Sequence, residues 1–187
     1  MVDNKLPEYF DLSDGTRMPS VGLGTFGAST VEEIVIAIKE NGYRHIDTAK
    51  VYKNEEVVGK AINQCINEGV VRREEMYVVT KIWPSDLKDC EAACRASLER
   101  LDLTYVDLYL IHWPGHCEEV KEPMHLIWPR MEQLVELGLT KSIGVSNFNV
   151  QLLGDLLTYA RIKPVCNQVE LNPWLQQNDL VKYCQWK

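Results

Sequence analysis

The sequence has 187 residues, of which 45% are hydrophobic and 25% are charged, and this composition is typical of one globular core. A net charge of −7, with no basic run longer than Arg72-Arg73, argues against nucleic acid as a partner. No stretch approaches the roughly 18 apolar residues of a membrane span, and the amino terminus is too polar for a signal sequence. We therefore expect a cytoplasmic protein that binds neither nucleic acid nor membrane.

Six cysteines are present, and none of them forms a C-x-x-C pair. Cys90 and Cys94 would share one helix face, and His116-Cys117 adjoins two glutamates. Neither group supplies four ligands at the spacing of a zinc site. We expect free thiols and no bound metal.

The chain opens with a hairpin signal and continues as a regular alternation. Asp14-Gly15 between two short β-like runs predicts a hairpin within residues 1–20. Apolar strand-like runs follow at residues 21–25, 45–49, 77–82, 106–112, 142–147 and 165–171. Helical patterns lie between and after them at residues 31–40, 55–67, 90–101, 125–137 and 150–160, and another begins near Asn178.

This alternation predicts one domain over residues 1–187, with β/α units one to six in residues 21–187. The near-continuous apolar strands are typical of a parallel sheet that is covered on both faces. Such a sheet is either open and doubly wound or closed as a barrel, and the pattern alone does not choose. The chain stops within an amphipathic helix that has no capping glycine, so we expect it to be incomplete at its C-terminus.

One motif suggests a different fold. Gly22-x-Gly24-x-x-Gly27 matches the dinucleotide fingerprint of Rossmann dehydrogenases, and Asp47 lies twenty residues after Gly27. However, only Val21 precedes the first glycine as strand, and the helix should begin beyond Gly27, at a capping box that starts with Thr30. A Rossmann dehydrogenase is thus an alternative interpretation, and a glycine-rich turn without a ligand is another.

Polar side chains stand at the ends of three consecutive predicted strands. Lys81 lies within an apolar run, so its ammonium needs a buried anion, for which Asp47 is the best candidate. His112 closes the fourth strand and Tyr52 follows the second. Each residue alone is compatible with a structural role, whereas the four together favour catalysis. A phenol acts as an acid near neutral pH if a nearby cation stabilises its phenolate, and Lys81 would be that cation.

At these residues the sequence resembles the aldo-keto reductase superfamily. The matching segments are GLGTF (22–26), YRHIDTAKVYKNE (43–55), VTKIWP (79–84), SLERLDLTYVDLYLIHWP (97–114), KSIGVSNFN (141–149) and NQVELNPWLQQ (167–177). The resemblance implies a TIM-type (β/α)8 barrel with an N-terminal hairpin. It also implies an NADP-dependent oxidoreductase that reduces aldehydes or ketones by hydride transfer.

Carried over position by position, the resemblance implies the following roles. Tyr52 would be the general acid, Lys81 and Asp47 would lower its pKa, and His112 would orient the carbonyl. NADP(H) would be bound by Gly24, Thr25, Asp47, Ser146, Asn147 and Gln168. An apolar substrate pocket would be formed by Phe26, Trp83, His112 and Trp113. The expected partner is a small carbonyl compound, and the full-length protein is expected to be a monomer.

Two departures from the family leave alternatives open. The loop 115–124 is short for the sugar- and prostaglandin-reducing branch, so the substrate is not indicated. The seventh and eighth units are absent, and these contribute to cofactor binding in the family. NADPH rather than NADH is therefore inferred from the family alone. A non-catalytic fragment with a binding or structural role is the alternative function, because the superfamily also includes channel subunits and lens proteins.

Overall fold

The protein is described by a computed structural model that covers residues 7–115 and 122–186. Strands β1 (Tyr9–Asp11) and β2 (Arg17–Pro19) form the predicted antiparallel hairpin. Gly15 has a φ of 85° in its turn, a conformation that glycine adopts without steric cost. The hairpin thus forms where the Asp14-Gly15 signal predicts it.

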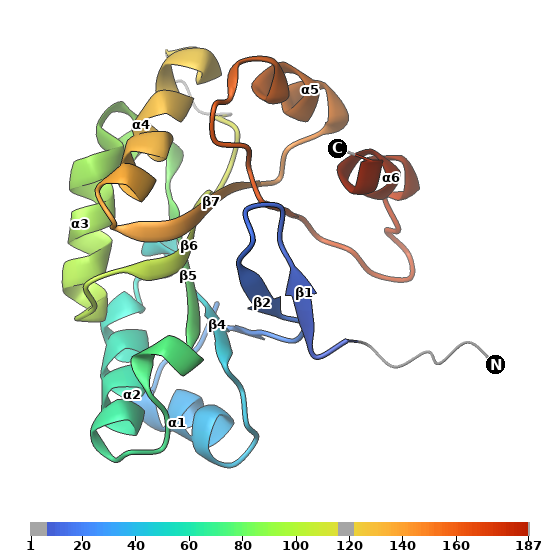
Figure 1. Ribbon diagram of the computed structural model, residues 1–187. Helices are drawn as coiled ribbons and strands as arrows, with labels where there is room; N and C mark the ends of the chain where they lie inside the picture. Colours follow the sequence, from blue (N-terminus) through green and yellow to red (C-terminus); the bar gives the residue numbers. More distant parts are fainter. Residues whose placement is uncertain (1–6, 116–121, 187) are drawn as a thin grey trace.

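The other six strands form one parallel sheet whose spatial order is the order along the chain. They are β3 (Leu23–Gly24), β4 (His45–Asp47), β5 (Tyr77–Ile82), β6 (Val106–Ile111), β7 (Thr140–Ser146) and β8 (Asn167–Gln168). Doubly wound sheets reverse their strand order at a switch point, whereas a barrel does not. The sequential order therefore decides in favour of a curled, barrel-type sheet (Figure 1).

Helices connect the strands and cover the outer side of the sheet (Figure 1). They are α1 (Val31–Lys39), α2 (Glu55–Asn67), α3 (Cys90–Leu101), α4 (Met124–Glu136), α5 (Val150–Tyr159) and α6 (Asn178–Trp186). Three short 3-10 helices, η1 (Lys50–Tyr52), η2 (Arg73–Glu75) and η3 (Pro84–Asp89), complete the elements of the described residues. The predicted capping box of Thr30 and Glu33 is present at the start of α1. None of the described helices is long and apolar enough to cross a membrane.

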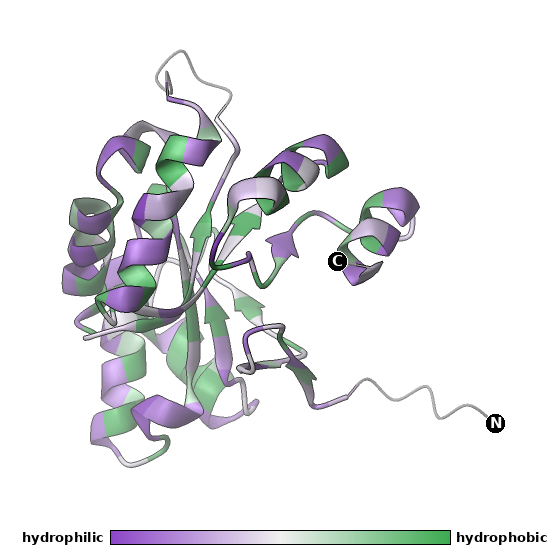
Figure 2. Ribbon diagram, turned by 45° about the horizontal axis from the view of Figure 1, so that its top comes forward, coloured by the Kyte–Doolittle hydropathy of each residue, from purple (hydrophilic) through white to green (hydrophobic). Residues whose placement is uncertain are grey.

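The two faces of the sheet carry different side chains at a period of two residues. On β5, Val78 packs outward against the helices, whereas Val79 belongs to a separate inner cluster with Leu108 and Leu110 of β6. Figure 2 shows hydrophobic colour on the central strands and mixed colours on the helices that cover them. The alternation places Lys81, two residues after Val79, on the inner face of the sheet.

The hairpin covers one end of the barrel. The Ser142 hydroxyl donates a 2.5 Å hydrogen bond to Oδ2 of Asp14, and its oxygen also lies 3.2 Å from the Thr16 hydroxyl. Ser142 lies near the start of β7, so the hairpin lies at the amino-terminal ends of the strands. The hairpin does not cover the opposite end of the barrel, where the carboxyl ends of the strands lie.

The structure does not support the Rossmann interpretation of the glycine motif. Strand β3 consists of Leu23–Gly24 and lies inside the motif instead of preceding it. Gly27 has a φ of 88° and stands outside the helix, which begins at Val31. In this structure the motif forms a turn between β3 and α1.

Candidate active site at the carboxyl ends of the strands

The predicted site residues come together at the carboxyl ends of the six parallel strands. Gly24, Asp47, Ser146 and Gln168 are the last residues of β3, β4, β7 and β8. Lys81 is the last but one residue of β5. Thr25, His112 and Asn147 directly follow β3, β6 and β7. In parallel β/α barrels this rim is where catalytic residues lie. Side chains that are far apart in the sequence thereby lie at the same end of the sheet.

Lys81 is a buried cation whose counter-ion is the carboxylate of Asp47. Its side chain is 0% exposed, and Nζ donates hydrogen bonds to Oδ1 of Asp47 at 2.5 Å and to the carbonyl oxygen of Thr48 at 2.9 Å. Burial lowers the pKa of Lys81, and the negative charge of Asp47 acts in the opposite direction. The predicted Lys81–Asp47 pair is therefore present as a direct ion pair.

The second carboxylate oxygen of Asp47 has a partner from the far side of the sheet. Nε2 of Gln168 donates a hydrogen bond to Oδ2 of Asp47 over 2.9 Å. Asp47 belongs to β4 and Gln168 to β8, and three strands lie between them in the sheet order. This contact crosses the mouth of the barrel and shows how strongly the sheet is curled. No local pattern in the sequence predicts this contact.

Tyr52 lies on η1 and faces Lys81 and His112 with its ring. Nζ of Lys81 is 5.1 Å from the ring centroid of Tyr52, and the ring of His112 is in edge contact at 5.6 Å. Within the described residues, no hydrogen bond of the Tyr52 hydroxyl is present. Tyr52 thus approaches Lys81 through its ring face, in a cation–π arrangement.

The direction of the pKa shift of Tyr52 differs from the sequence-based expectation. Burial and the negative charge of Asp47 raise the pKa of Tyr52 above its ordinary value of 10.0. From the sequence we expect Lys81 and Asp47 to lower this pKa. Burial is the larger cause, and the carboxylate of Asp47 adds to it because a nearby negative charge disfavours the phenolate. Tyr52 is therefore a neutral phenol near neutral pH.

His112 is buried and neutral. Its side chain packs edge-on against Trp83, with ring centroids 5.4 Å apart. Burial, together with the charge of Lys81, lowers the pKa of His112 to about 4. Nδ1 of His112 has no hydrogen-bond partner among the described residues. A neutral imidazole offers one donor and one acceptor, so His112 can donate a hydrogen bond to a carbonyl oxygen.

A polar cluster from β7 and β8 continues the rim. The Ser146 hydroxyl donates to the main-chain oxygen of Gln168 at 2.7 Å. Nδ2 of Asn147 donates to the Ser146 hydroxyl at 3.1 Å and to the main-chain oxygen of His112 at 2.9 Å. Asn147 has a φ of 63°, the left-handed conformation that asparagine tolerates better than most residues. These hydrogen bonds hold the side chains of Ser146 and Asn147 in fixed positions at the end of β7.

A structural residue that the sequence analysis missed supports the site. Nδ2 of Asn54 donates to the main-chain oxygens of Thr25 at 2.7 Å and of Ala28 at 3.2 Å. Oδ1 of Asn54 accepts from the Thr48 hydroxyl at 2.9 Å. Asn54 thereby ties the loop after β3 to the loop after β4. Asn54 occupies the N-cap position of α2, but its side chain makes no capping bond there.

Aromatic side chains flank the rim. Phe26 is in edge contact with Tyr52 at 5.1 Å between ring centroids. Phe26 is 81% exposed and Trp113 is 40% exposed, so both are free to contact a ligand. No group of three metal-ligating side chains occurs in residues 7–115 and 122–186, and the His116-Cys117 pair lies outside them.

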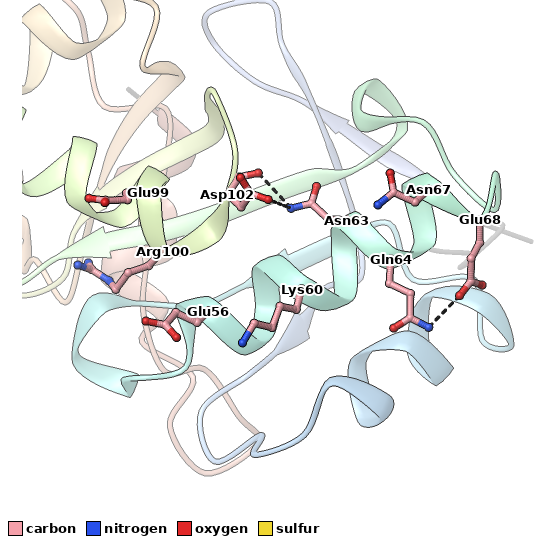
Figure 3. A pocket seen from close by; sticks show the side chains of 9 residues that line it. All are labelled: Glu56, Lys60, Asn63, Gln64, Asn67, Glu68, Glu99, Arg100 and Asp102. Carbon is pink, nitrogen blue, oxygen red and sulfur yellow. Dashed lines mark hydrogen bonds between the residues drawn. The ribbon is translucent and has the colours of Figure 1, made fainter.

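A separate groove of about 780 Å³ lies on the outside of the barrel between α2 and α3 (Figure 3). Its lining is polar and includes Lys60, Asn63 and Arg100. Nδ2 of Asn63 donates to the main-chain oxygen of Asp102 at 3.0 Å, which satisfies the end of α3. These side chains serve the packing of two helices and lie away from the rim.

The sequential parallel sheet, covered by helices on its outer side and closed at one end by a hairpin, defines a protein of the β/α-barrel class. The model of the Aldo/keto reductase family matches residues 12–187, and the chain belongs to that family. Six of the β/α units of the (β/α)8 barrel are present, together with the N-terminal hairpin.

Individual relatives agree with this assignment. The chain is 44% identical to Aldose reductase C of Dictyostelium discoideum, over 94% of this chain and 62% of that protein. It is 46% identical to Glyoxal reductase of Bacillus subtilis, over 98% of this chain and 65% of that protein. The crystal structure of the Bombyx mori aldo-keto reductase in complex with NADP superimposes with a TM-score of 0.88 at 39% identity, over 95% of this chain and 62% of that one. The chain thus spans less than two thirds of these relatives.

Proposed function

We propose that the protein is an NADP-dependent oxidoreductase that reduces aldehydes or ketones to alcohols. The observation that carries the proposal is the buried Lys81–Asp47 ion pair beneath the ring of Tyr52, with neutral His112 beside it. These groups supply a proton donor and a hydrogen-bond donor next to each other at an open rim. Both are what the reduction of a carbonyl requires.

NADP(H) would lie along the rim from β3 to β8. When bound, it supplies the hydride. Ser146, Asn147 and Gln168 would hold its carboxamide, since they form one hydrogen-bonded cluster of amides and a hydroxyl. At the other end, a Cβ added to Gly24 would meet nothing within 4 Å, so the backbone there is open to a close approach. Thr25 follows Gly24 at the end of the same strand.

Tyr52 would donate the proton to the carbonyl oxygen. Its raised pKa keeps the phenol protonated until charge develops on that oxygen. At that moment the ammonium of Lys81 becomes the nearest source of stabilisation for the phenolate. His112 would donate a second hydrogen bond and fix the orientation of the carbonyl, because its low pKa keeps it neutral.

The substrate would be a small carbonyl compound with an apolar part. Phe26, Trp83 and Trp113 would form the pocket walls, which is a common composition for such sites. Relatives named for aldose and for glyoxal reduction are compatible with this class but differ in the carbonyl that they reduce. We further propose that residues 1–187 belong to a single domain, that the protein acts in the cytoplasm and that it is a monomer when full-length.

The test is NADPH oxidation at 340 nm with a series of aldehydes, for the wild type and for Tyr52→Phe. We expect Tyr52→Phe to abolish turnover but to leave the Kd of NADPH nearly unchanged, because only the transferable proton is lost. Tyr9→Phe, on the exposed hairpin, is the matched control. Wild-type turnover by Tyr52→Phe would mean that another group donates the proton. A wild type that binds NADPH without turnover would favour a non-catalytic binding role.

A further inference from the structure

Asp47 uses its two carboxylate oxygens for two different partners. Oδ1 accepts from the buried ammonium of Lys81, and Oδ2 accepts from the side-chain amide of Gln168. A carboxylate only accepts hydrogen bonds, so it can hold Gln168 only by the NH2 end of the amide. The amide oxygen of Gln168 is then turned away from Asp47.

The main chain of Gln168 is fixed as well. Its carbonyl oxygen accepts from the Ser146 hydroxyl at 2.7 Å and from the main-chain nitrogen of Asn147 at 3.0 Å. With both the backbone and the NH2 end held, the remaining freedom of the side chain is small. Gln168 therefore presents an oxygen acceptor in one direction before any ligand arrives.

We propose that Asp47 is a positioning residue for cofactor recognition: by holding the NH2 end of Gln168, it makes the rim of β8 an acceptor that selects a nicotinamide carrying an NH2 group. This inference rests on the proposed function, because Gln168 is there assigned to the carboxamide. It gives Asp47 a second task that is separate from its ion pair with Lys81. Gln168 contacts the ligand, and the hydrogen bond to Asp47 determines whether the amide oxygen or the NH2 group of Gln168 faces it.

The substitution Asp47→Asn makes a sharp prediction. Lys81 can only donate, so the new amide oxygen stays toward Lys81 and the new NH2 group replaces Oδ2. The NH2 groups of residues 47 and 168 would then face each other. The side-chain amide of Gln168 must rotate by about 180° so that its oxygen accepts a hydrogen bond from the new NH2 group. The variant would present an NH2 donor to the cofactor where the wild type presents an oxygen.

The probes are NADPH and its 3-acetylpyridine analogue, which keeps the carbonyl oxygen but lacks the NH2 group. Kd values are measured by quenching of tryptophan fluorescence. One lost hydrogen bond should weaken binding of the analogue to the wild type by roughly 3- to 10-fold relative to NADPH. In Asp47→Asn this preference should disappear or reverse. Gln168→Met, which leaves the Lys81–Asp47 pair intact, should also lose the preference.

Glu55→Gln is the matched control, because it makes the same change at a buried carboxylate whose partners are Thr80 and Arg100. It should keep the wild-type preference. An unchanged preference in Asp47→Asn, with both ligands still bound, would overturn the inference and leave the proposed function standing. A wild type that binds neither ligand would overturn the proposed function and this inference together.

A measurement on the free protein keeps the inference testable if Asp47→Asn does not fold. In the wild type, one side-chain amide proton of Gln168 should be shifted downfield and protected from exchange with solvent, as expected for a hydrogen bond to a carboxylate. Gln64 bonds Glu68 at an exposed site and serves as the reference amide. A Gln168 amide that exchanges as fast as that of Gln64 would overturn the orientation by Asp47.

Discussion

Lys81 and Asp47 form an ion pair whose two members are buried to different degrees. The Lys81 side chain is 0% exposed, whereas the Asp47 side chain keeps 14% of its surface in solvent. Asp47 also has Gln168 as a second partner, whereas the other hydrogen bond of Lys81 goes to the main-chain oxygen of Thr48. Removal of Asp47 and removal of Lys81 should therefore lower the free energy of unfolding by different amounts.

We expect Asp47→Leu to be more destabilising than Lys81→Met. Removal of Asp47 leaves a buried ammonium without a counter-ion, which costs about 3–5 kcal/mol. Removal of Lys81 leaves a carboxylate that still reaches solvent and Gln168, so the cost should be smaller. The double variant should recover part of the loss. Urea unfolding of the wild type, the two single variants and the double variant gives the four free energies of unfolding of this double-mutant cycle. Equal losses of free energy in the two single variants would contradict the prediction.

His112 should make the protein less stable in mild acid. Its pKa is lowered from 6.5 to about 4 in the folded state, so between these values the unfolded chain binds a proton that the folded protein does not. The free energy of unfolding is therefore highest above pH 6.5 and falls as the pH decreases toward 4. His112→Gln should flatten this dependence between pH 7 and 4.5 in urea titrations. A variant with the wild-type slope would show that other groups cause it.

Gly59 should not tolerate a side chain, although it lies in a helix. A Cβ at Gly59 of α2 would overlap the main-chain carbonyl of Leu101 at the end of α3. Gly59→Ala should cost about 1–3 kcal/mol through overpacking, despite the better helix propensity of alanine. Gly154 of α5 is the matched control, because its nearest neighbour is the hydroxyl of Tyr183 at 3.3 Å. Gly154→Ala should be neutral or stabilising in thermal unfolding, and equal Tm shifts would contradict the packing argument.

The two edge strands should make the 187-residue chain associate. β3 and β8 stand at the ends of the six-stranded sheet, and unpaired strand edges template contacts between chains. Apolar side chains next to these strands are exposed, with Val21 at 57% and Leu171 at 51%. We expect concentration-dependent association in size-exclusion chromatography with light scattering, reduced by Leu171→Lys. A monodisperse monomer at high concentration would contradict this.

The sequence determined the elements and their order. Residues 55–67, 77–82 and 90–101 form the predicted helices and strand with the predicted bounds, because caps and apolar periodicity act within a few residues. The first, second and sixth strands are shorter than predicted, and β8 keeps only Asn167–Gln168. Their residues lie at sheet edges or bends, where pairing with a neighbour rather than local pattern sets the length.

The polar strand ends were also evident in the sequence, since a lysine in an apolar run requires an anion. Only the tertiary structure decided how these groups act on each other. The contact of Gln168 with Asp47 spans 121 residues and exists because the sheet curls. The raised pKa of Tyr52 results from its burial and from the negative charge of Asp47. Electrostatic energies depend on distances and burial across the barrel mouth, and neither quantity is a property of any local segment.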